Sequence, residues 1–145
     1  MANRVNRTWS IASAIAVAIL VLGVNTANAH ETSFPSEIFI DEFIYAQASG
    51  DTTSTGHITS PKEGCVPGRT VNFFAVSDAG TPRDPSDDVR TLLDTDRTSL
   101  NGAYYVEGDS PIGTDSWIVR VTRKNIGSSG HKHFCQSADA GFVLF

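Results

Sequence analysis

Four histidines are the side chains of this 145-residue sequence that are best suited to bind a transition metal. His30 differs from the others because a signal-peptidase cut after Ala29 would give it a free α-amine. The α-amine and the imidazole of one residue can together chelate copper, and imidazoles from His57, His131 or His133 would complete the ligand set. Copper held through His30 is therefore one hypothesis for this chain.

A second group of metal ligands is offered by residues 131–135, which read HKHFC. On a strand, His131, His133 and Cys135 would share one face, as ligands of a single ion must. The glycine- and serine-rich sequence before them indicates a solvent-exposed loop instead, and a cysteine in a disulfide cannot bind a metal. We expect a solvated loop at this position.

Acidic side chains between residues 84 and 96 are candidates for calcium, which prefers carboxylate oxygens. The candidates are Asp84, Asp87 and Asp88, with Asp94 and Asp96 further along the chain. Their spacing differs from the Asp-x-[Asp/Asn]-x-[Asp/Asn]-Gly pattern of calcium-binding loops. An acidic loop without a bound ion is the simpler interpretation.

The sequence lacks the common patterns of catalysis. It contains no Gly-x-Ser-x-Gly, His-Glu-x-x-His or Cys-x-x-Cys pattern and no glycine-rich phosphate loop before a helix. We therefore expect no enzymatic activity and no cofactor. The copper hypothesis is the one route to an enzyme.

The segment 1–29 has the three parts of an export signal. Arg4 and Arg7 give a positive start, Ile11 to Val24 is an uncharged apolar run, and small residues precede the cut after Ala29. This run is shorter than the roughly 20 residues that span a bilayer, and no cysteine near the cut could carry a lipid. We expect a mature chain that starts at His30 and is secreted, to the periplasm or the medium, without a membrane anchor.

The mature chain, 30–145, would carry nine basic against sixteen acidic side chains and a formal net charge of −7. This charge excludes a nucleic-acid binder with a clustered basic face. In an oxidising compartment, Cys65 and Cys135 can form a single intramolecular pair. Closing a loop of this length stabilises the folded state by about 4 kcal/mol in the chain-entropy model. We expect a disulfide.

Short apolar runs between polar turns predict an all-β fold. The expected strands are 38–45, 56–60, 69–77, 89–99, 103–107, 116–123 and 141–145, with local pairing at 134–137. Residues 30–36 are expected as a polar lead and 47–55 as a loop, and Asn101-Gly102 predicts a hairpin turn. About seven strands predict an antiparallel sandwich of two sheets. By segment, 1–29 is the signal, 30–53 an N-terminal strand and loop, and 54–145 the sandwich, with 30–145 as one folded unit.

The order of these segments resembles the carboxypeptidase-regulatory-like, or transthyretin-like, β-sandwich domains. The resemblance covers roughly residues 55–122 and rests on the strand at 56–60, the turn before 70–74, the Asn-Gly segment within 97–106 and the strand at 115–121. Ser99 stands where the family often has Asp, and Trp117 where it has Tyr. The resemblance implies an Ig-like or transthyretin-like sandwich that serves as an accessory or interaction module. The cysteine pair is similar to that of a group of bacterial secreted proteins.

The first expected strand carries large apolar side chains on both faces, with Phe39, Phe43 and Tyr45 opposite Ile38, Ile40 and Ile44. Such a strand is usually buried on both faces or covered by a partner. We hypothesise that it lies partly at an interface. The sequence as a whole predicts a secreted, non-catalytic module with a binding or structural role, whose partner is a protein or a component of the cell envelope.

Overall fold

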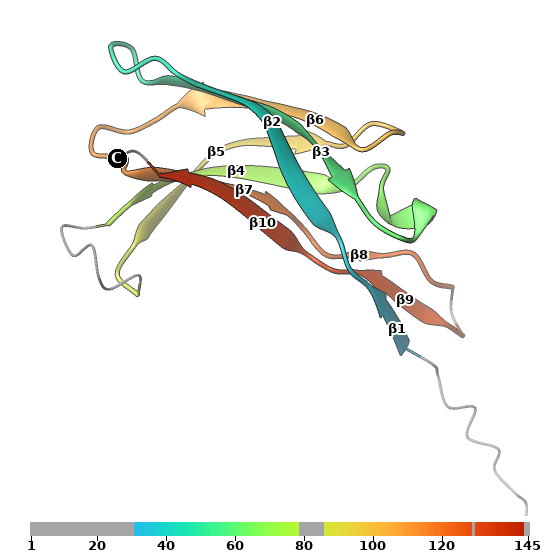
Figure 1. The fold of residues 1–145 in the computed structure, drawn as a ribbon. Helices are drawn as coiled ribbons and strands as arrows, with labels where there is room; N and C mark the ends of the chain where they lie inside the picture. Colours follow the sequence, from blue (N-terminus) through green and yellow to red (C-terminus); the bar gives the residue numbers. More distant parts are fainter. Residues whose placement is uncertain (1–30, 79–85, 129, 144–145) are drawn as a thin grey trace, which may run out of the picture.

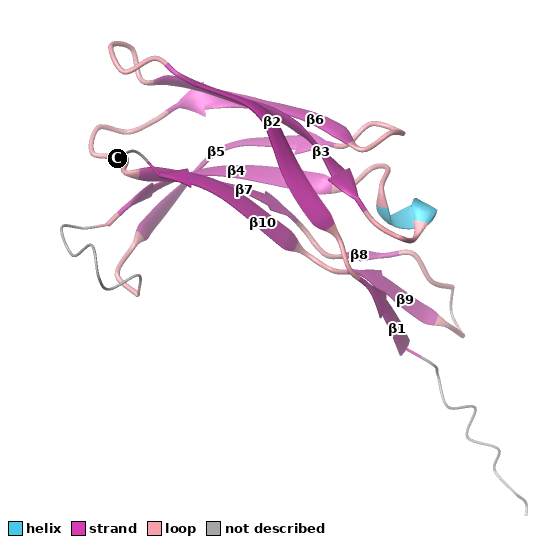
Figure 2. Cartoon of the chain, in the orientation of Figure 1, coloured by secondary structure: helices cyan, strands magenta, loops and turns pink. Residues whose placement is uncertain are grey.

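The computed structural model describes residues 31–78, 86–128 and 130–143, and their strands form three sheets (Figure 1). One sheet has the order β2 (Glu37–Tyr45), β3 (Asp51–Thr59), β6 (Ala103–Asp109). The second has the order β10 (Ala138–Val143), β7 (Ser116–Val121), β4 (Thr70–Ser77), β5 (Val89–Arg97). A small sheet has the order β1 (Glu31–Phe34), β9 (Lys132–Cys135), β8 (Lys124–Asn125). The described helical structure is one short 3-10 turn, η1 (Glu63–Cys65), so the predicted all-β fold is confirmed (Figure 2).

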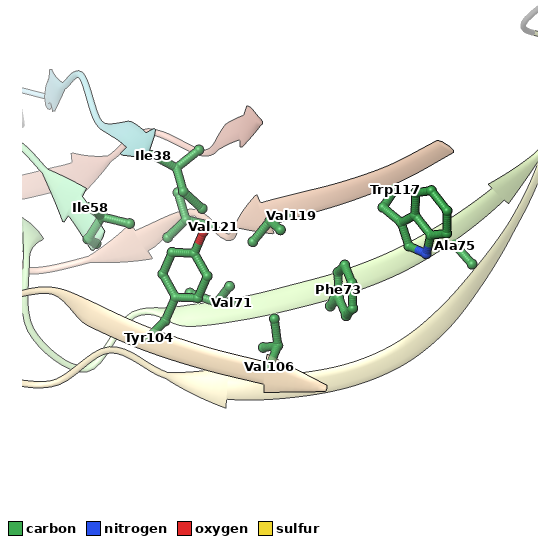
Figure 3. Packing of buried hydrophobic residues seen from close by; sticks show 10 residues of the cluster. All are labelled: Ile38, Ile58, Val71, Phe73, Ala75, Tyr104, Val106, Trp117, Val119 and Val121. Atoms are coloured by element: carbon green, nitrogen blue, oxygen red, sulfur yellow. The ribbon is translucent and has the colours of Figure 1, made fainter. Parts of the chain in front are cut away.

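The two larger sheets pack face to face and enclose the core (Figure 3). Alternation along the strands sets which side chains point inward: Trp117, Val119 and Val121 on β7 are all buried, as their spacing predicts. The complete buried cluster is Ile38, Ile58, Val71, Phe73, Ala75, Tyr104, Val106, Trp117, Val119 and Val121. The described residues include no helix with the length and apolarity needed to cross a membrane.

The structure corrects the predicted faces of β2. The register against β3 shifts between Ile40 and Glu42, which is a β-bulge and moves every later side chain to the other face. Phe43 and Tyr45 therefore pack against the core, on the same side as Ile40, while Phe39 lies outside with 43% of its surface exposed. The prediction that Phe39 and Phe43 share a face was wrong.

Residues 47–55 were predicted to be a loop, but β3 begins at Asp51. The inward residues of its first part are small: Thr52 and Ser54 are buried, and Gly56 lies under Tyr104, whereas Ile58 near its end belongs to the apolar core. A Cβ at Gly56 would come within 2.0 Å of the Phe39 carbonyl oxygen and 2.5 Å of the Tyr104 hydroxyl. Because the Tyr104 ring on β6 fills this space, the facing residue on β3 must have no side chain.

The Asn-Gly turn forms, with Gly102 at φ 87°, but it does not make a hairpin. Its two flanking strands, β5 and β6, belong to opposite sheets, so the turn connects the two layers of the sandwich. The amide of Gly102 donates to the Ser99 carbonyl oxygen at 3.1 Å, and the Gly102 carbonyl accepts from Ile58 at 3.1 Å. The turn thereby also fastens the end of β3.

Two further differences concern the ends of the chain. The predicted polar lead contains β1, which pairs with β9 in parallel, so the fold is not purely antiparallel. The last strand begins at Ala138 rather than at residue 141. Neither feature could be predicted, because these segments contain mostly polar or small residues. A strand at a sheet edge is held by backbone hydrogen bonds, which do not require alternating apolar side chains.

Candidate functional site

Arg69 lies at the point where three chain segments leave the sandwich for the small sheet, and it is fully buried. Its guanidinium donates five hydrogen bonds: two to the Thr122 carbonyl oxygen, and one each to the Cys65 carbonyl, the Gln136 carbonyl and the Ser36 hydroxyl. These acceptors lie before β2, in η1, between β7 and β8, and between β9 and β10. Burial lowers the pKa of Arg69, because desolvation penalises its charged form.

The predicted disulfide between Cys65 and Cys135 is present beside Arg69, and both cysteines are fully buried. It joins η1 to the end of β9. Sequence reasoning found this bond but missed Arg69, because a single arginine before a strand is usually a surface residue. The bond and the guanidinium together fix the small sheet to the sandwich.

The small sheet carries the histidine hollow, a depression of about 360 Å³ lined by Lys62, Ile126, Gly127, Ser128, His131 and His133. The expectation of a solvated loop at 131–135 was wrong, since β9 covers most of it. The imidazole centroids of His131 and His133 lie 6.4 Å apart, with an angle of 57° between the rings. His131 is exposed and His133 is half-buried.

Aromatic and hydrogen-bond contacts hold this histidine pair in place. His133 stacks on Phe34 of β1 with centroids 5.9 Å apart and planes 10° apart. The amide of Ile126 donates to the His133 carbonyl oxygen at 2.9 Å, and the amide of His131 donates to Ser128 at 3.1 Å. The strand therefore presents both imidazoles from an ordered backbone.

The parallel register of β1 and β9 brings the start of the described chain to the histidine hollow. Glu31 lies opposite Lys132, and Thr32 lies opposite His133. Arg123 contacts Glu31 at 3.2 Å from the far side of this small sheet. His30 lies outside the described residues, but the peptide bond attaches it to Glu31.

His57 is not brought to this site. It lies on β3, where its Nδ1 is 2.9 Å from an Asp41 carboxylate oxygen and its ring stacks on Phe39 at 5.1 Å. Of the three predicted partners of His30, the structure thus places two together and one in another sheet. Within residues 31–78, 86–128 and 130–143, no cluster of three or more His, Cys, Asp or Glu side chains could hold a metal.

The acidic candidates do not form a calcium site in the described chain. Asp84 lies outside the described residues, and Asp87 and Asp88 precede β5. One carboxylate oxygen of Asp94 accepts from the Glu107 amide at 3.1 Å, and one of Asp96 accepts from the Tyr105 amide at 2.9 Å. These two aspartates on β5 cap the free edge of β6, which protects that edge from pairing with other strands.

The loops 47–50 and 110–114 lie at the end of the sandwich opposite the small sheet (Figure 1). With Tyr45 they line the loop-end hollow, a depression of about 540 Å³. None of its lining residues is charged. Sequence reasoning treated these loops as connectors, because nothing in their composition shows that they face each other. Such mixed aromatic and hydroxyl linings suit uncharged polar ligands.

Comparison with known proteins adds no relative: no family model, curated protein or solved structure matches this chain.

Proposed function

We propose that the mature chain is an exported, non-catalytic β-sandwich module that binds an uncharged surface or ligand through the loop-end hollow. The hollow is the observation that carries this proposal. Its volume of about 540 Å³ falls in the range of small-molecule sites. Loops at one end of a sandwich are also where such folds commonly bind, because a rigid scaffold positions them.

The chemistry of the lining supports an uncharged ligand. Tyr45 offers a partly buried ring, and Gln47, Ser49 and Thr114 offer amide and hydroxyl groups. Ile112 stands fully exposed at the tip of the second loop. Together with the Tyr45 ring, Ile112 gives the lining of the hollow apolar area without charge.

The two loops are held together before any ligand arrives. The amide of Ser110 donates to the Gly50 carbonyl oxygen at 2.9 Å, and the Trp117 indole donates to the Ser110 hydroxyl at 2.7 Å. The same hydroxyl lies 2.5 Å from that of Thr52. A pre-formed hollow loses less entropy on binding than a flexible one, so these bonds favour affinity.

Export is supported by the disulfide, which persists in oxidising compartments, and by the signal-like segment 1–29. The family resemblance supports an accessory role without catalytic machinery. The transthyretin-like or Ig-like subtype of the sandwich belongs to the same proposal.

The test is binding of fluorescently labelled mature protein to washed cell envelopes of the producing organism. We expect saturable binding that weakens at least tenfold in a Gln47→Ala/Ile112→Ser variant. Leu100→Ser is the matched control, because Leu100 is 91% exposed in the turn between β5 and β6. Its binding should equal that of the unmodified protein.

Two results would contradict the proposal: the absence of saturable binding, or equal binding by the hollow variant and the unmodified protein. Chemical analysis of the envelopes after incubation tests the non-catalytic part. We expect no released or modified material, and product that accumulates with time would show an enzyme.

A further inference from the structure

The turn between β5 and β6 contains an asparagine followed by a glycine, the pair of residues at which asparagine deamidates most readily. Asn101 is exposed to water. Gly102 has no Cβ that would hinder the approach of its backbone nitrogen to another atom. This nitrogen can therefore reach Cγ of the Asn101 side chain, and that attack is the first step of deamidation.

The Ser99 hydroxyl contacts the oxygen atom that gains negative charge in this reaction. It donates to Oδ1 of Asn101 at 2.5 Å, and the Ala103 carbonyl oxygen, at 3.2 Å, is the more distant alternative acceptor. When a nitrogen attacks Cγ, Oδ1 becomes an oxyanion, which a positioned hydroxyl stabilises. The amide of Ala103 donates to Oγ of Ser99 at 3.0 Å and fixes its position. The turn thus holds a donor against the reacting carbonyl.

One hydrogen bond in the same turn opposes the attack. The amide of Gly102 donates to the Ser99 carbonyl oxygen at 3.1 Å, and the nitrogen must leave this acceptor before it can reach Cγ. Breaking a single bond of this kind slows the reaction by about tenfold at most. Loss of one oxyanion donor slows acyl transfer in enzymes by about a hundredfold or more. A partly solvated donor on Oδ1 therefore still offsets the restraint on Gly102.

We propose that Asn101 deamidates spontaneously in the folded protein and that the Ser99 hydroxyl promotes the reaction. The Gly102 nitrogen forms a bond to Cγ, and the bond between Cγ and Nδ2 breaks. The amide proton of Gly102 passes through water to the leaving nitrogen, which departs as ammonia and leaves a five-membered succinimide. Water then opens one of the two ring carbonyls to give aspartate or isoaspartate, with no oxidation or reduction. The reaction does not depend on the function proposed for the loop-end hollow.

The two products differ in their effect on β3. The Gly102 carbonyl oxygen accepts from the Ile58 amide at 3.1 Å. Isoaspartate adds one methylene to the backbone just before Gly102, and there is little free space around this glycine. A Cβ on Gly102 would lie 2.6 Å from the Ile58 carbonyl oxygen and 2.8 Å from a Val66 methyl carbon. We therefore expect isoaspartate to move the Gly102 carbonyl away from Ile58, whereas aspartate leaves the backbone unchanged and adds one negative charge.

The experiment incubates the folded, oxidised protein in mildly alkaline buffer and follows each asparagine by peptide mass spectrometry. We expect Asn101 to deamidate at least tenfold faster than Asn72 and Asn125, because large residues follow both of these asparagines. Ser99→Ala should slow deamidation of Asn101 at least fivefold, and Ser99→Thr, which keeps the hydroxyl, should restore the rate. In the urea-unfolded protein, Asn101 should deamidate no faster than in the folded protein.

Faster deamidation of Asn101 in the unfolded chain would overturn the proposal, because the turn would then protect this residue. An unchanged or higher rate in Ser99→Ala would overturn the role of the hydroxyl. Hydrogen exchange on the separated products tests the effect on β3. The Ile58 amide should exchange at least tenfold faster in the isoaspartate form and at the original rate in the aspartate form, and equal exchange in both forms would refute the loosening of β3.

Discussion

Two substitutions of Arg69 test separately how much its positive charge and the planar shape of its guanidinium contribute to the free energy of unfolding. In Arg69→Met the side chain keeps an unbranched apolar stem but loses the guanidinium and with it all five hydrogen bonds, and in Arg69→Lys it keeps the charge on a single nitrogen. The four acceptors of Arg69 belong to four different chain segments. An ammonium has three donors at one point, so it cannot satisfy four acceptors spread around a planar guanidinium.

The magnitude follows from the acceptors that are left behind. A buried group that loses its hydrogen bond costs about 1–3 kcal/mol. Arg69→Met leaves three carbonyls without this donor, and the relief of removing a buried cation offsets part of the loss. We expect a net loss of about 3–5 kcal/mol in the free energy of unfolding for Arg69→Met. For Arg69→Lys we expect about 2–3 kcal/mol.

Equilibrium urea denaturation of the oxidised mature protein measures both variants. The control is Arg97→Met, because Arg97 is exposed on β5, and its stability should change by no more than about 0.5 kcal/mol. An Arg69→Met protein as stable as the unmodified one would show that the buried charge is a net burden. An Arg69→Lys protein within about 1 kcal/mol of the unmodified one would refute the argument from shape.

The remaining predictions concern the disulfide, a turn and an ion pair. Replacing both disulfide cysteines by serine should lower the unfolding free energy by about 2–4 kcal/mol in urea denaturation. Gly102→Ala should cost at least about 1 kcal/mol more than Gly113→Ala in the same assay: both glycines have φ 87°, but a Cβ at Gly102 would lie 2.6 Å from the Ile58 carbonyl oxygen, while one at Gly113 meets nothing within 4 Å. Arg120 donates two hydrogen bonds to Asp139 and lowers the pKa of that carboxyl. A carboxyl whose pKa is lower in the folded state stabilises the fold above its unfolded pKa and loses this effect as the pH falls through its folded pKa. Since both side chains are partly exposed, Asp139→Asn should cost no more than about 1 kcal/mol at pH 7. This cost should shrink as the pH falls below the unfolded pKa of Asp, about 3.9, as thermal denaturation across pH would show.

The sequence predicted the elements in which alternation or apolar runs are visible. β4 and β7 have alternating large side chains, and both lie where they were expected, with the same faces buried. The disulfide could be predicted because two cysteines allow one pairing. The fold class therefore follows from local patterns.

Elements whose sequence is shaped by a distant partner were missed. β3 has small polar residues inside because Tyr104 from β6 occupies the space above Gly56. The side-chain faces of β2 depend on a bulge at Asp41, which no alternation rule can locate in a run that is apolar on both sides. Both facts are set by packing between strands and not by local preference.

At the candidate site, too, the residue types could be predicted from the sequence but their positions relative to one another could not. His131 and His133 were recognised as possible ligands, and His57 was an equal alternative until the sheets placed it elsewhere. β1 was missed because a polar four-residue strand has no apolar signal, yet its parallel register is what brings Glu31 to the histidine pair. The strand pairing decides which segments come together at the histidine hollow, and the local sequence does not reveal that pairing.

The position of the loop-end hollow makes binding there separable from the stability of the small sheet. The loops that line the loop-end hollow lie at the end of the sandwich opposite the small sheet (Figure 1). Arg69 and the disulfide lie at the small sheet, where they contact Gln136 and the end of β9. Loosening the small sheet by removing the disulfide should therefore leave the loop-end hollow intact. Envelope binding through loops 47–50 and 110–114 depends on Ser110 and Trp117 instead, so it should persist while the sandwich stays folded.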